Sequence, residues 1–217
     1  MEESPLLDDY VLACSPRKPP RICFLATASG DAAEYVERFF RAFEGRACIA
    51  SHLTLADLPE RIADHDIIYV GGGNTAHMLE AWRTHGFDVA LRAASLRGVV
   101  MAGLSAGMNC WFETSVTDSF GPLGPLADGL GLIAGSACPH YDSEAARRPT
   151  YRALVGRGLA PGYAADDGVA LHFVDEILRS VVSSRKLACA YRVERTGETV
   201  LPARYLGDPD PRGHPTE

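Results

Sequence analysis

Residues 103–107 form the stretch GLSAG, in which Ser105 stands between two glycines after an apolar run. A serine hydroxyl acts as a nucleophile when a sharp turn exposes it and a base accepts its proton. Residues 98–102 have the apolar, β-branched character of a strand buried on both faces, and residues 106–111 can begin a helix. The pattern predicts strand, turn and helix with Ser105 at the turn. A turn needed only for tight packing is the alternative interpretation.

A second glycine-rich stretch, GGGNT at 71–75, also follows an apolar run. Ligand sites of open α/β sheets lie at the carboxyl ends of the strands, so this loop and the Ser105 turn are predicted to share one edge. Their N–H groups, that of Ala106 among them, can then converge on one oxygen atom. A phosphate cradle is the competing interpretation, but the Lys-Ser/Thr of a P-loop and the dinucleotide spacing are missing. A purely structural turn is the other alternative.

Three further groups can move or hold a proton. His140 ends an apolar run; a single histidine there is usually packed or hydrogen-bonded, and is a base only beside a nucleophile. Asp167 belongs to the Asp-Asp-Gly run at 166–168, and adjacent carboxylates in a turn are usually solvated. Asp118 lies in residues 113–131, which are too irregular for an element and too long for a simple connector. Such loops usually line sites.

The elements that must position these groups alternate between strands and helices. Strands are predicted at 21–27, 47–53 and 66–70, and helices at 32–43, 58–63 and around Met78, Leu79 and Trp82. Later we expect a strand pair near 132–138, a strand at 169–174, a weak helix or extended segment at 176–184, and a hairpin of 188–194 and 198–201. The alternation predicts an α/β fold with a mostly parallel sheet and helices on both faces.

Length and composition suit one α/β domain. The chain has 217 residues, 47% of them hydrophobic, which is enough to bury a substantial core over residues 21–206. We expect residues 1–20 to be partly ordered and residues 207–217 to be a disordered tail. The net charge of -7 leaves no basic surface for nucleic acid. Six scattered cysteines suggest reduced thiols, and with no signal segment or long apolar run we expect a cytoplasmic protein with no membrane partner.

Taken in order, the four motifs GGGNT at 71–75, LSAG at 104–107, PHY at 139–141 and DG at 167–168 resemble the dipeptidase E family of serine peptidases. These are the aspartyl dipeptidases, with cyanophycinases as distant relatives, and the resemblance covers about residues 6–206. It implies a flavodoxin-like or class I glutamine amidotransferase-like α/β fold with no metal or organic cofactor. It also implies that Ser105 is the nucleophile and His140 its general base.

The same chemistry requires a carboxylate that orients the imidazole and stabilises the cation that forms on it. Asp167 falls where the family's acidic residue lies, although that residue is commonly glutamate, and a shorter aspartate shifts the geometry. Asp118 matches more loosely an aspartate also proposed for the triad, and we favour Asp167. Gly72 or Gly73 together with Ala106 would supply the oxyanion N–H groups, each typically worth about 10²–10³ in rate.

Family dipeptidases prefer an N-terminal aspartate, which requires a cation for its side chain. Arg147, Arg148 and Arg152 lie in the matching segment, although arginines in a polar helix usually form a solvated face. Asn74 and Thr75 are further candidates for substrate binding. The resemblance also implies one more strand and a glycine-rich turn ahead of residues 4–10. This chain starts near that point, so it either lacks this strand or begins at an internal methionine.

The sequence thus predicts a serine exopeptidase that hydrolyses short peptides, with dipeptides that carry an N-terminal Asp as the candidate substrates, as a monomer or homodimer. A catalytically silent protein that binds a small molecule or peptide on the same fold is the alternative. An α/β-hydrolase esterase would place its acid before its histidine, whereas His140 precedes Asp167. A glutaminase of the amidotransferase type would need cysteine at position 105.

Overall fold

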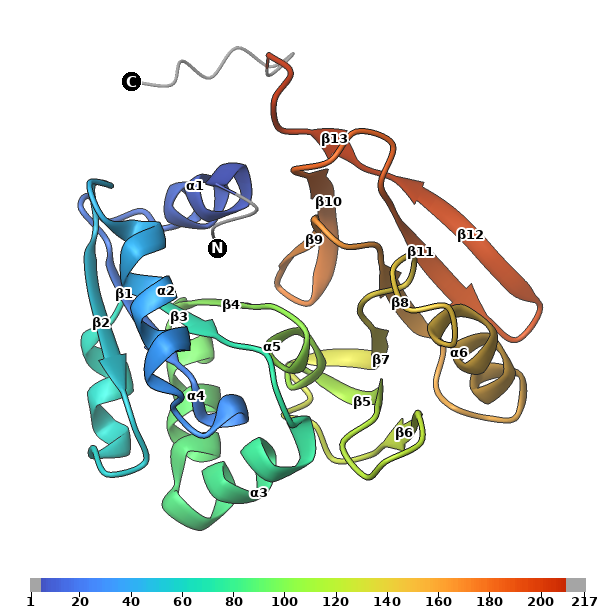
Figure 1. Cartoon of the computed structure of the whole chain (residues 1–217), viewed down its shortest axis with the longest axis horizontal. Coiled ribbons are helices and arrows are strands. Elements are labelled where there is room, and N and C mark those ends of the chain that lie inside the picture. Colours follow the sequence, from blue (N-terminus) through green and yellow to red (C-terminus); the bar gives the residue numbers. More distant parts are fainter. Residues whose placement is uncertain (1–4, 210–217) are drawn as a thin grey trace.

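A four-stranded parallel sheet forms the first half of the protein, in the order β2-β1-β3-β4 (Figure 1). The computed structural model describes residues 5–209. The strands are β1 (Arg21–Leu25), β2 (Ile49–Leu53), β3 (Ile67–Val70) and β4 (Val100–Gly103). Val70 and Gly103 are partners in the β3–β4 register. The loops that follow these two strands therefore leave the sheet at the same edge, as the sequence predicts.

Helices cover both faces of this sheet, because successive side chains of a strand point to opposite faces. Ile22 and Phe24 of β1 pack with α1 and α2 on one face. Cys23 and Leu25 pack with α3, α4 and η2 on the other. The helices are α1 (Pro5–Cys14), α2 (Ala33–Phe43), α3 (Thr75–His85) and α4 (Phe87–Leu96), with the 3-10 turns η1 (Thr27–Ser29) and η2 (Pro59–Asp64). The predicted α/β class, with helices on both faces of a parallel sheet, is confirmed.

The second half is mostly β-structure. After the short helix α5 (Ala106–Asn109), a mixed six-stranded sheet runs in the order β12-β11-β8-β7-β5-β6. Its strands are β5 (Phe112–Thr117), β6 (Gly124–Leu126), β7 (Ile133–Cys138), β8 (Gly162–Ala165), β11 (Cys189–Glu194) and β12 (Gly197–Pro202). Only the β5–β7 and β7–β8 pairs are parallel. Helix α6 (Arg147–Gly156) packs on this sheet through Tyr151 and Val155.

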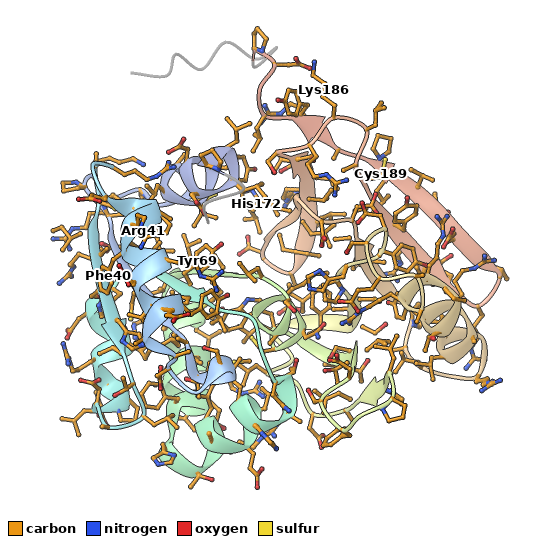
Figure 2. The ribbon with its side chains drawn as sticks, viewed as in Figure 1. Phe40, Arg41, Tyr69, His172, Lys186 and Cys189 are labelled. Carbon is orange, nitrogen blue, oxygen red and sulfur yellow. The ribbon has the colours of Figure 1, made fainter. Side chains whose placement is uncertain are left out.

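A small third sheet joins the two halves. It has the order β13-β10-β9, with β9 (Val169–Val174), β10 (Ile177–Ser183) and β13 (Arg204–Tyr205). His172 of β9 faces the N-terminal helix (Figure 2), and its Nδ1 lies 2.7 Å from the hydroxyl of Tyr10 in α1. Tyr10 of the first half thus contacts a strand residue that lies 162 positions later in the chain.

Several predicted elements differ from the structure, mainly after residue 110. Residues 113–131, expected to be irregular, contain most of β5 and all of β6, and residues 133–138 form one strand rather than a pair. Residues 162–165 are a strand that the sequence did not indicate. Of the two alternatives for residues 176–184, the extended one is confirmed, because they are mostly the strand β10. Residues 100–103 form the strand predicted before Ser105, but the expected burial on both faces was wrong, because β4 lies at the edge of its sheet and its residues are only half-buried. Short strands rich in Thr, Ser and Gly show little alternation of apolar and polar residues, so pairing with neighbouring strands rather than local sequence determines where they form.

The structure describes more of the N-terminal segment than of the C-terminal one. Within the expected partly ordered segment 1–20, residues 5–14 form α1, while residues 1–4 lie outside the described part. A disordered tail is predicted for residues 207–217. Of these, residues 207–209 are described, and residues 210–217 lie outside the described part of the chain.

Candidate active site

The Ser105 turn is a sharp connection between β4 and α5. Ser105 has φ 54° and ψ −112°, and Ala106 begins the helix directly after it. Such a backbone costs a non-glycine residue of the order of 1–3 kcal/mol and persists only where the surroundings enforce it. The surroundings are close-packed, because a Cβ on Gly107 would lie 2.2 Å from the Val70 carbonyl oxygen and one on Gly103 would lie 2.5 Å from the Gly107 oxygen. The two glycines permit the turn that exposes Ser105.

The glycine loop after β3 touches this turn. A Cβ on Gly72 would lie 3.3 Å from the Ser105 Cβ, so Gly72 and Ser105 are neighbours across the sheet edge. Gly73 has φ 138°, and a Cβ there would overlap the Ala28 carbonyl. The Gly72 N–H donates to the Tyr35 hydroxyl at 2.8 Å, a contact the sequence did not suggest. Within residues 5–209, the N–H groups of Gly73 and Ala106 have no hydrogen-bond acceptor. These two groups are free to bind an oxyanion.

His140 and Asp167 form the second part of the site. His140 follows β7 with φ 58°, and its Nδ1 lies 2.7 Å from Asp167 Oδ1. Their side chains are 28% and 42% exposed, so the pair is open to a ligand from solvent. Burial alone would raise the pKa of Asp167, but hydrogen bonds from Ser143 and His140 and the charges of His140 and Arg185 lower it below its usual value. Asp167 is therefore held as a carboxylate beside the imidazole.

Helix α5 connects the two parts. It packs against both β3 and β7, and Figure 1 shows it between the end of β4 and β7. Ser105 caps its start, and His140 follows the end of β7. The Ser105 hydroxyl forms no hydrogen bond with any residue in the range 5–209. In free enzymes the nucleophile–base hydrogen bond is often long and tightens only with substrate.

Within residues 5–209, no hydrogen bond joins Asp118 to His140. Asp118 is exposed just after β5, and its carbonyl accepts from the Gly121 N–H. Its neighbour Ser119 accepts from the Ala76 N–H at the start of α3 through its hydroxyl. The loop that carries Asp118 thus helps to cap α3.

The two polar residues of the GGGNT stretch have structural contacts. Asn74 caps α3 through its side-chain oxygen, which accepts from the His77 N–H at 3.0 Å, and its amide nitrogen donates to the Ser119 carbonyl. Thr75 is buried, and its hydroxyl lies 3.5 Å from the Asn109 amide nitrogen. Both side chains are engaged by neighbouring elements in the free protein.

The three arginines of α6 differ in their surroundings. Arg147 is buried, paired with Glu144 at 2.7 Å and hydrogen-bonded to the Val116 carbonyl. Arg148 binds Glu198, and its guanidinium lies over the rings of Tyr141 and Tyr191. Tyr141 also donates to Glu198 at 2.8 Å. No sequence pattern indicated Glu198, because Glu198 lies fifty residues beyond Arg148 on a different element.

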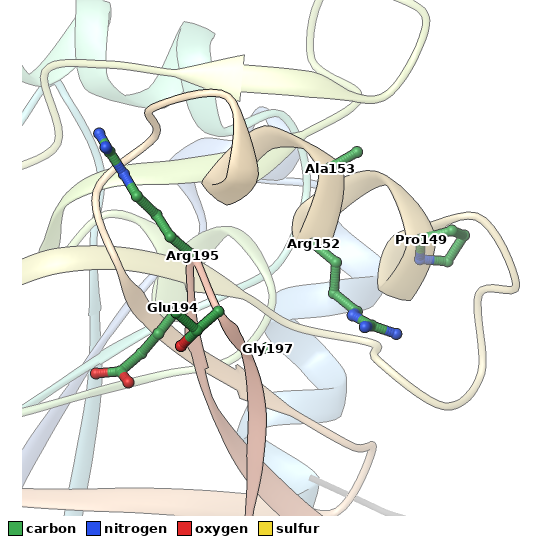
Figure 3. A pocket seen from close by; sticks show the side chains of 7 residues that line it. Pro149, Arg152, Ala153, Glu194, Arg195 and Gly197 are labelled. Atoms are coloured by element: carbon green, nitrogen blue, oxygen red, sulfur yellow. The ribbon is translucent and has the colours of Figure 1, made fainter.

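Arg152 is the most exposed of the three, at 54%, and it lines a shallow groove between α6 and the β11–β12 turn. Figure 3 shows its side chain extending away from that of Arg195, the groove's other arginine. Two cations that point apart do not form one anion site. The two arginines of this groove therefore do not support a binding site for a substrate carboxylate between them.

Two features typical of other classes of protein, a metal cluster and a membrane-spanning helix, are absent from residues 5–209. No cluster of three His, Cys, Asp or Glu side chains within residues 5–209 is arranged to hold a metal ion. No helix in that range has the length and apolar character needed to cross a membrane.

Comparison with known proteins identifies the class to which this fold and site belong. The model of peptidase family S51 matches residues 1–181, and the chain belongs to that family. It is a serine-type peptidase. The resemblance predicted from the four motifs is confirmed.

Individual relatives agree with this family. The chain is 51% identical over 211 residues to YgaJ of Bacillus subtilis, described as an uncharacterized peptidase, with 93% of this chain and 91% of YgaJ covered. It is 37% identical over 90 residues to peptidase E of Citrobacter koseri, covering 41% and 39% of the two chains. The crystal structure of a peptidase from an acI-B1 actinobacterium has a TM-score of 0.72 at 15% identity, covering 94% and 91%. That last likeness shows the shared fold.

Proposed function

We propose that this peptidase is a serine exopeptidase that cleaves short peptides through an acyl-enzyme, with Ser105, His140 and Asp167 as its catalytic residues. The observation that carries the proposal is the 2.7 Å contact between His140 Nδ1 and Asp167 Oδ1. It leaves Nε2 of the same ring available to accept a proton from Ser105. The strained Ser105 turn supports it, since such backbone is characteristic of nucleophile turns.

In the proposed reaction, the Ser105 hydroxyl oxygen attacks the peptide carbonyl carbon while His140 takes the hydroxyl proton. His140 then gives this proton to the leaving amine, and an ester joins the acyl group to Ser105. Water then attacks the ester carbon while His140 accepts a proton from it. The bond between the acyl carbon and the Ser105 oxygen breaks, His140 returns the proton to that oxygen, and the acid is released. Asp167 orients the imidazole and stabilises its cationic form throughout.

The oxyanion that forms in each step needs donors placed in advance. The N–H groups of Gly73 and Ala106, free of acceptors within residues 5–209, support their assignment to this role. Gly72 can contribute only if its N–H exchanges the Tyr35 hydroxyl for the substrate oxygen. We therefore assign the role to Gly73 and Ala106 first.

Preference for an N-terminal aspartate is the finer part of the proposal. It requires a cation that a bound peptide can reach, and Arg147 is engaged in a buried ion pair. Arg148 and Arg152 remain the candidates on α6, although Glu198 competes for both. A substrate carboxylate must displace Glu198 or share these arginines with it.

A catalytically silent protein that binds peptides is the second candidate. The observation that favours it is the Ser105 hydroxyl, which has no hydrogen-bond partner within residues 5–209. The two candidates differ in whether bound peptide is cleaved.

The test is hydrolysis of Asp-Leu, Glu-Leu, Ala-Leu and Arg-Leu by the purified chain and by its Ser105→Ala variant. We expect cleavage that the variant reduces by about 10⁴–10⁶-fold, since no other group replaces the serine oxygen. Restriction to Asp-Leu would support the arginine assignment. Binding of peptide without cleavage by the folded wild-type chain would instead establish the silent protein.

A further inference from the structure

Asp167 stands at the corner of a tight turn. The turn closes through the Val169 N–H, which donates to the Asp166 carbonyl at 3.1 Å, and its third residue, Gly168, has φ 75°. This turn projects the Asp167 carboxylate toward His140. The backbone of one residue thus decides where the carboxylate lies.

One ion pair holds both polar backbone groups of Asp167. Its N–H donates to Asp142 Oδ1 at 2.9 Å, and its carbonyl accepts from Arg185 Nη1 at 2.9 Å. The same Arg185 nitrogen donates to Asp142 Oδ2 at 3.0 Å. Asp142 lies two residues after His140, so this ion pair also ties the segment that carries the base to the turn that carries the acid.

The segment after β10 fixes Arg185 in turn. The Gly168 carbonyl accepts from the Ser183 hydroxyl at 3.0 Å and from the Ser184 N–H at 2.9 Å. A Cβ on Gly168 would lie 2.9 Å from Arg185 Cδ, so the arginine stem packs directly on the turn. The segment 183–185 thus contacts the turn at the Gly168 carbonyl as well as at the Asp167 carbonyl.

We propose that Asp142 and Arg185 are positioning residues that orient Asp167 toward His140. The proposal rests on the proposed function, because it assigns them a task only if Asp167 is the catalytic acid. Their side chains are 32% and 52% exposed, and such ion pairs typically contribute only about 0–1 kcal/mol to stability. Their effect is therefore on geometry, and it is expected in kcat rather than in the melting temperature.

The first measurement is kcat and KM of Asp142→Ala and Arg185→Gln, on the peptide that the wild-type chain cleaves. A displaced catalytic group can cost about 10²-fold, so we expect kcat to fall by about 10–10²-fold with KM unchanged. Asp142→Asn keeps an oxygen that can accept from the Asp167 N–H, and it should retain more activity than Asp142→Ala. Arg61→Gln is the matched control, since it removes another exposed Arg–Asp pair, with Asp57, and should leave kcat unchanged.

The second measurement is a double-mutant cycle with Asp167→Asn. Residues that act through Asp167 lose their effect once its carboxylate is gone, so Asp142→Ala should cost less than about 2-fold in that background. Losses that multiply would show an independent structural effect and overturn the proposal. A wild-type kcat in both Asp142→Asn and Arg185→Gln would overturn the proposal as well. This outcome can be read even if Asp142→Ala does not fold.

The cycle also separates this inference from the proposed function. If Asp167→Asn abolishes hydrolysis while the Asp142 and Arg185 variants remain fully active, the acid assignment stands and the positioning role fails. If Asp167→Asn cleaves peptide at the wild-type rate, both the acid assignment and the positioning role are wrong.

Discussion

The two halves of the protein hold their catalytic candidates by different physical means. In the first half, Ser105 is set by backbone packing, because Gly103 and Gly107 allow contacts that any Cβ would prevent. In the second half, His140 and Asp167 are set by hydrogen bonds and charges, from Asp142, Ser143 and Arg185. Steric constraint is insensitive to pH and to charge, whereas a polar network responds to both. The difference predicts which substitutions affect each half.

After removal of the Ser105 hydroxyl, the largest expected effect comes from the acid of the polar half. Asp167→Asn keeps the shape of the side chain but removes the charge that stabilises the imidazolium, and we expect kcat to fall by about 10³–10⁴-fold. The rate of hydrolysis of the dipeptide that the wild-type chain cleaves measures this loss in kcat. Asp118→Asn tests the competing assignment, and a comparable loss there with an active Asp167→Asn variant would transfer the role of the acid to Asp118.

The next largest effect comes from the packed half. In Gly107→Ala the new Cβ would lie 2.2 Å from the Val70 carbonyl oxygen, so α5 must move away from β3. We expect a loss of about 3 kcal/mol in the free energy of unfolding, at the upper end for overpacking. Gly156→Ala is the matched control, because a Cβ there meets nothing within 4 Å, and it should leave stability unchanged or raise it by about 0.5–1 kcal/mol. Urea unfolding compares the two, and equal stabilities would contradict the steric account.

A smaller effect is expected at Glu198. Its side chain is 12% exposed and accepts hydrogen bonds from Arg148 and Tyr141. Burial alone would raise the pKa of Glu198, but these two partners and the charges of Arg148 and Arg152 lower it. Glu198→Gln turns an amide donor toward existing donors, which should cost about 1–3 kcal/mol in unfolding free energy.

Glu37→Gln is the control for this substitution, since Glu37 lies in an exposed pair with Arg41. Such surface pairs contribute about 0–1 kcal/mol. Thermal unfolding measures both variants. A Glu198→Gln variant as stable as the control would show that solvent replaces the network without cost.

The smallest effect concerns pH and compares one histidine from each half. Burial lowers the pKa of His65, before β3, and of His172, on β9. Below the ordinary histidine pKa the unfolded chain therefore binds more protons than the folded one, so stability is lost as pH falls and is complete above that value. We expect the melting temperature to rise between pH 5 and pH 7.

His172→Gln and His65→Gln separate the two contributions. His65 is only 9% exposed and hydrogen-bonded to Ser51, so its removal should reduce the pH dependence more than that of His172. Melting temperatures at pH 5 and pH 7 for the three proteins test this order. An unchanged pH dependence in both variants would assign it to other groups. Asp167 is not one of them, because its lowered pKa affects stability only at pH values below the ordinary aspartate pKa.

The sequence by itself determined the first half and the candidates within it. The unbroken apolar runs of β1 and β3 identify strands buried on both faces, as in a parallel sheet covered by helices. The spacing of Tyr35, Phe39 and Phe43 on α2 identifies a helix that buries one face, because that face recurs about every 3.6 residues. The glycines around Ser105 marked its turn, since only close backbone approach requires them there. The ordered motifs also sufficed to identify the family.

Tertiary structure decided the contacts that hold the second half of the site. Asp166, expected to be solvated, is buried and accepts from the Cys189 N–H, whereas its neighbour Asp167 reaches His140. Which of two adjacent aspartates contacts the histidine depends on a turn held by Arg185, eighteen residues further along the chain. Likewise the partners of the α6 arginines come from other elements, notably Glu198. Local patterns encode turns and periodicity, but contacts between distant residues exist only once the sheets have paired.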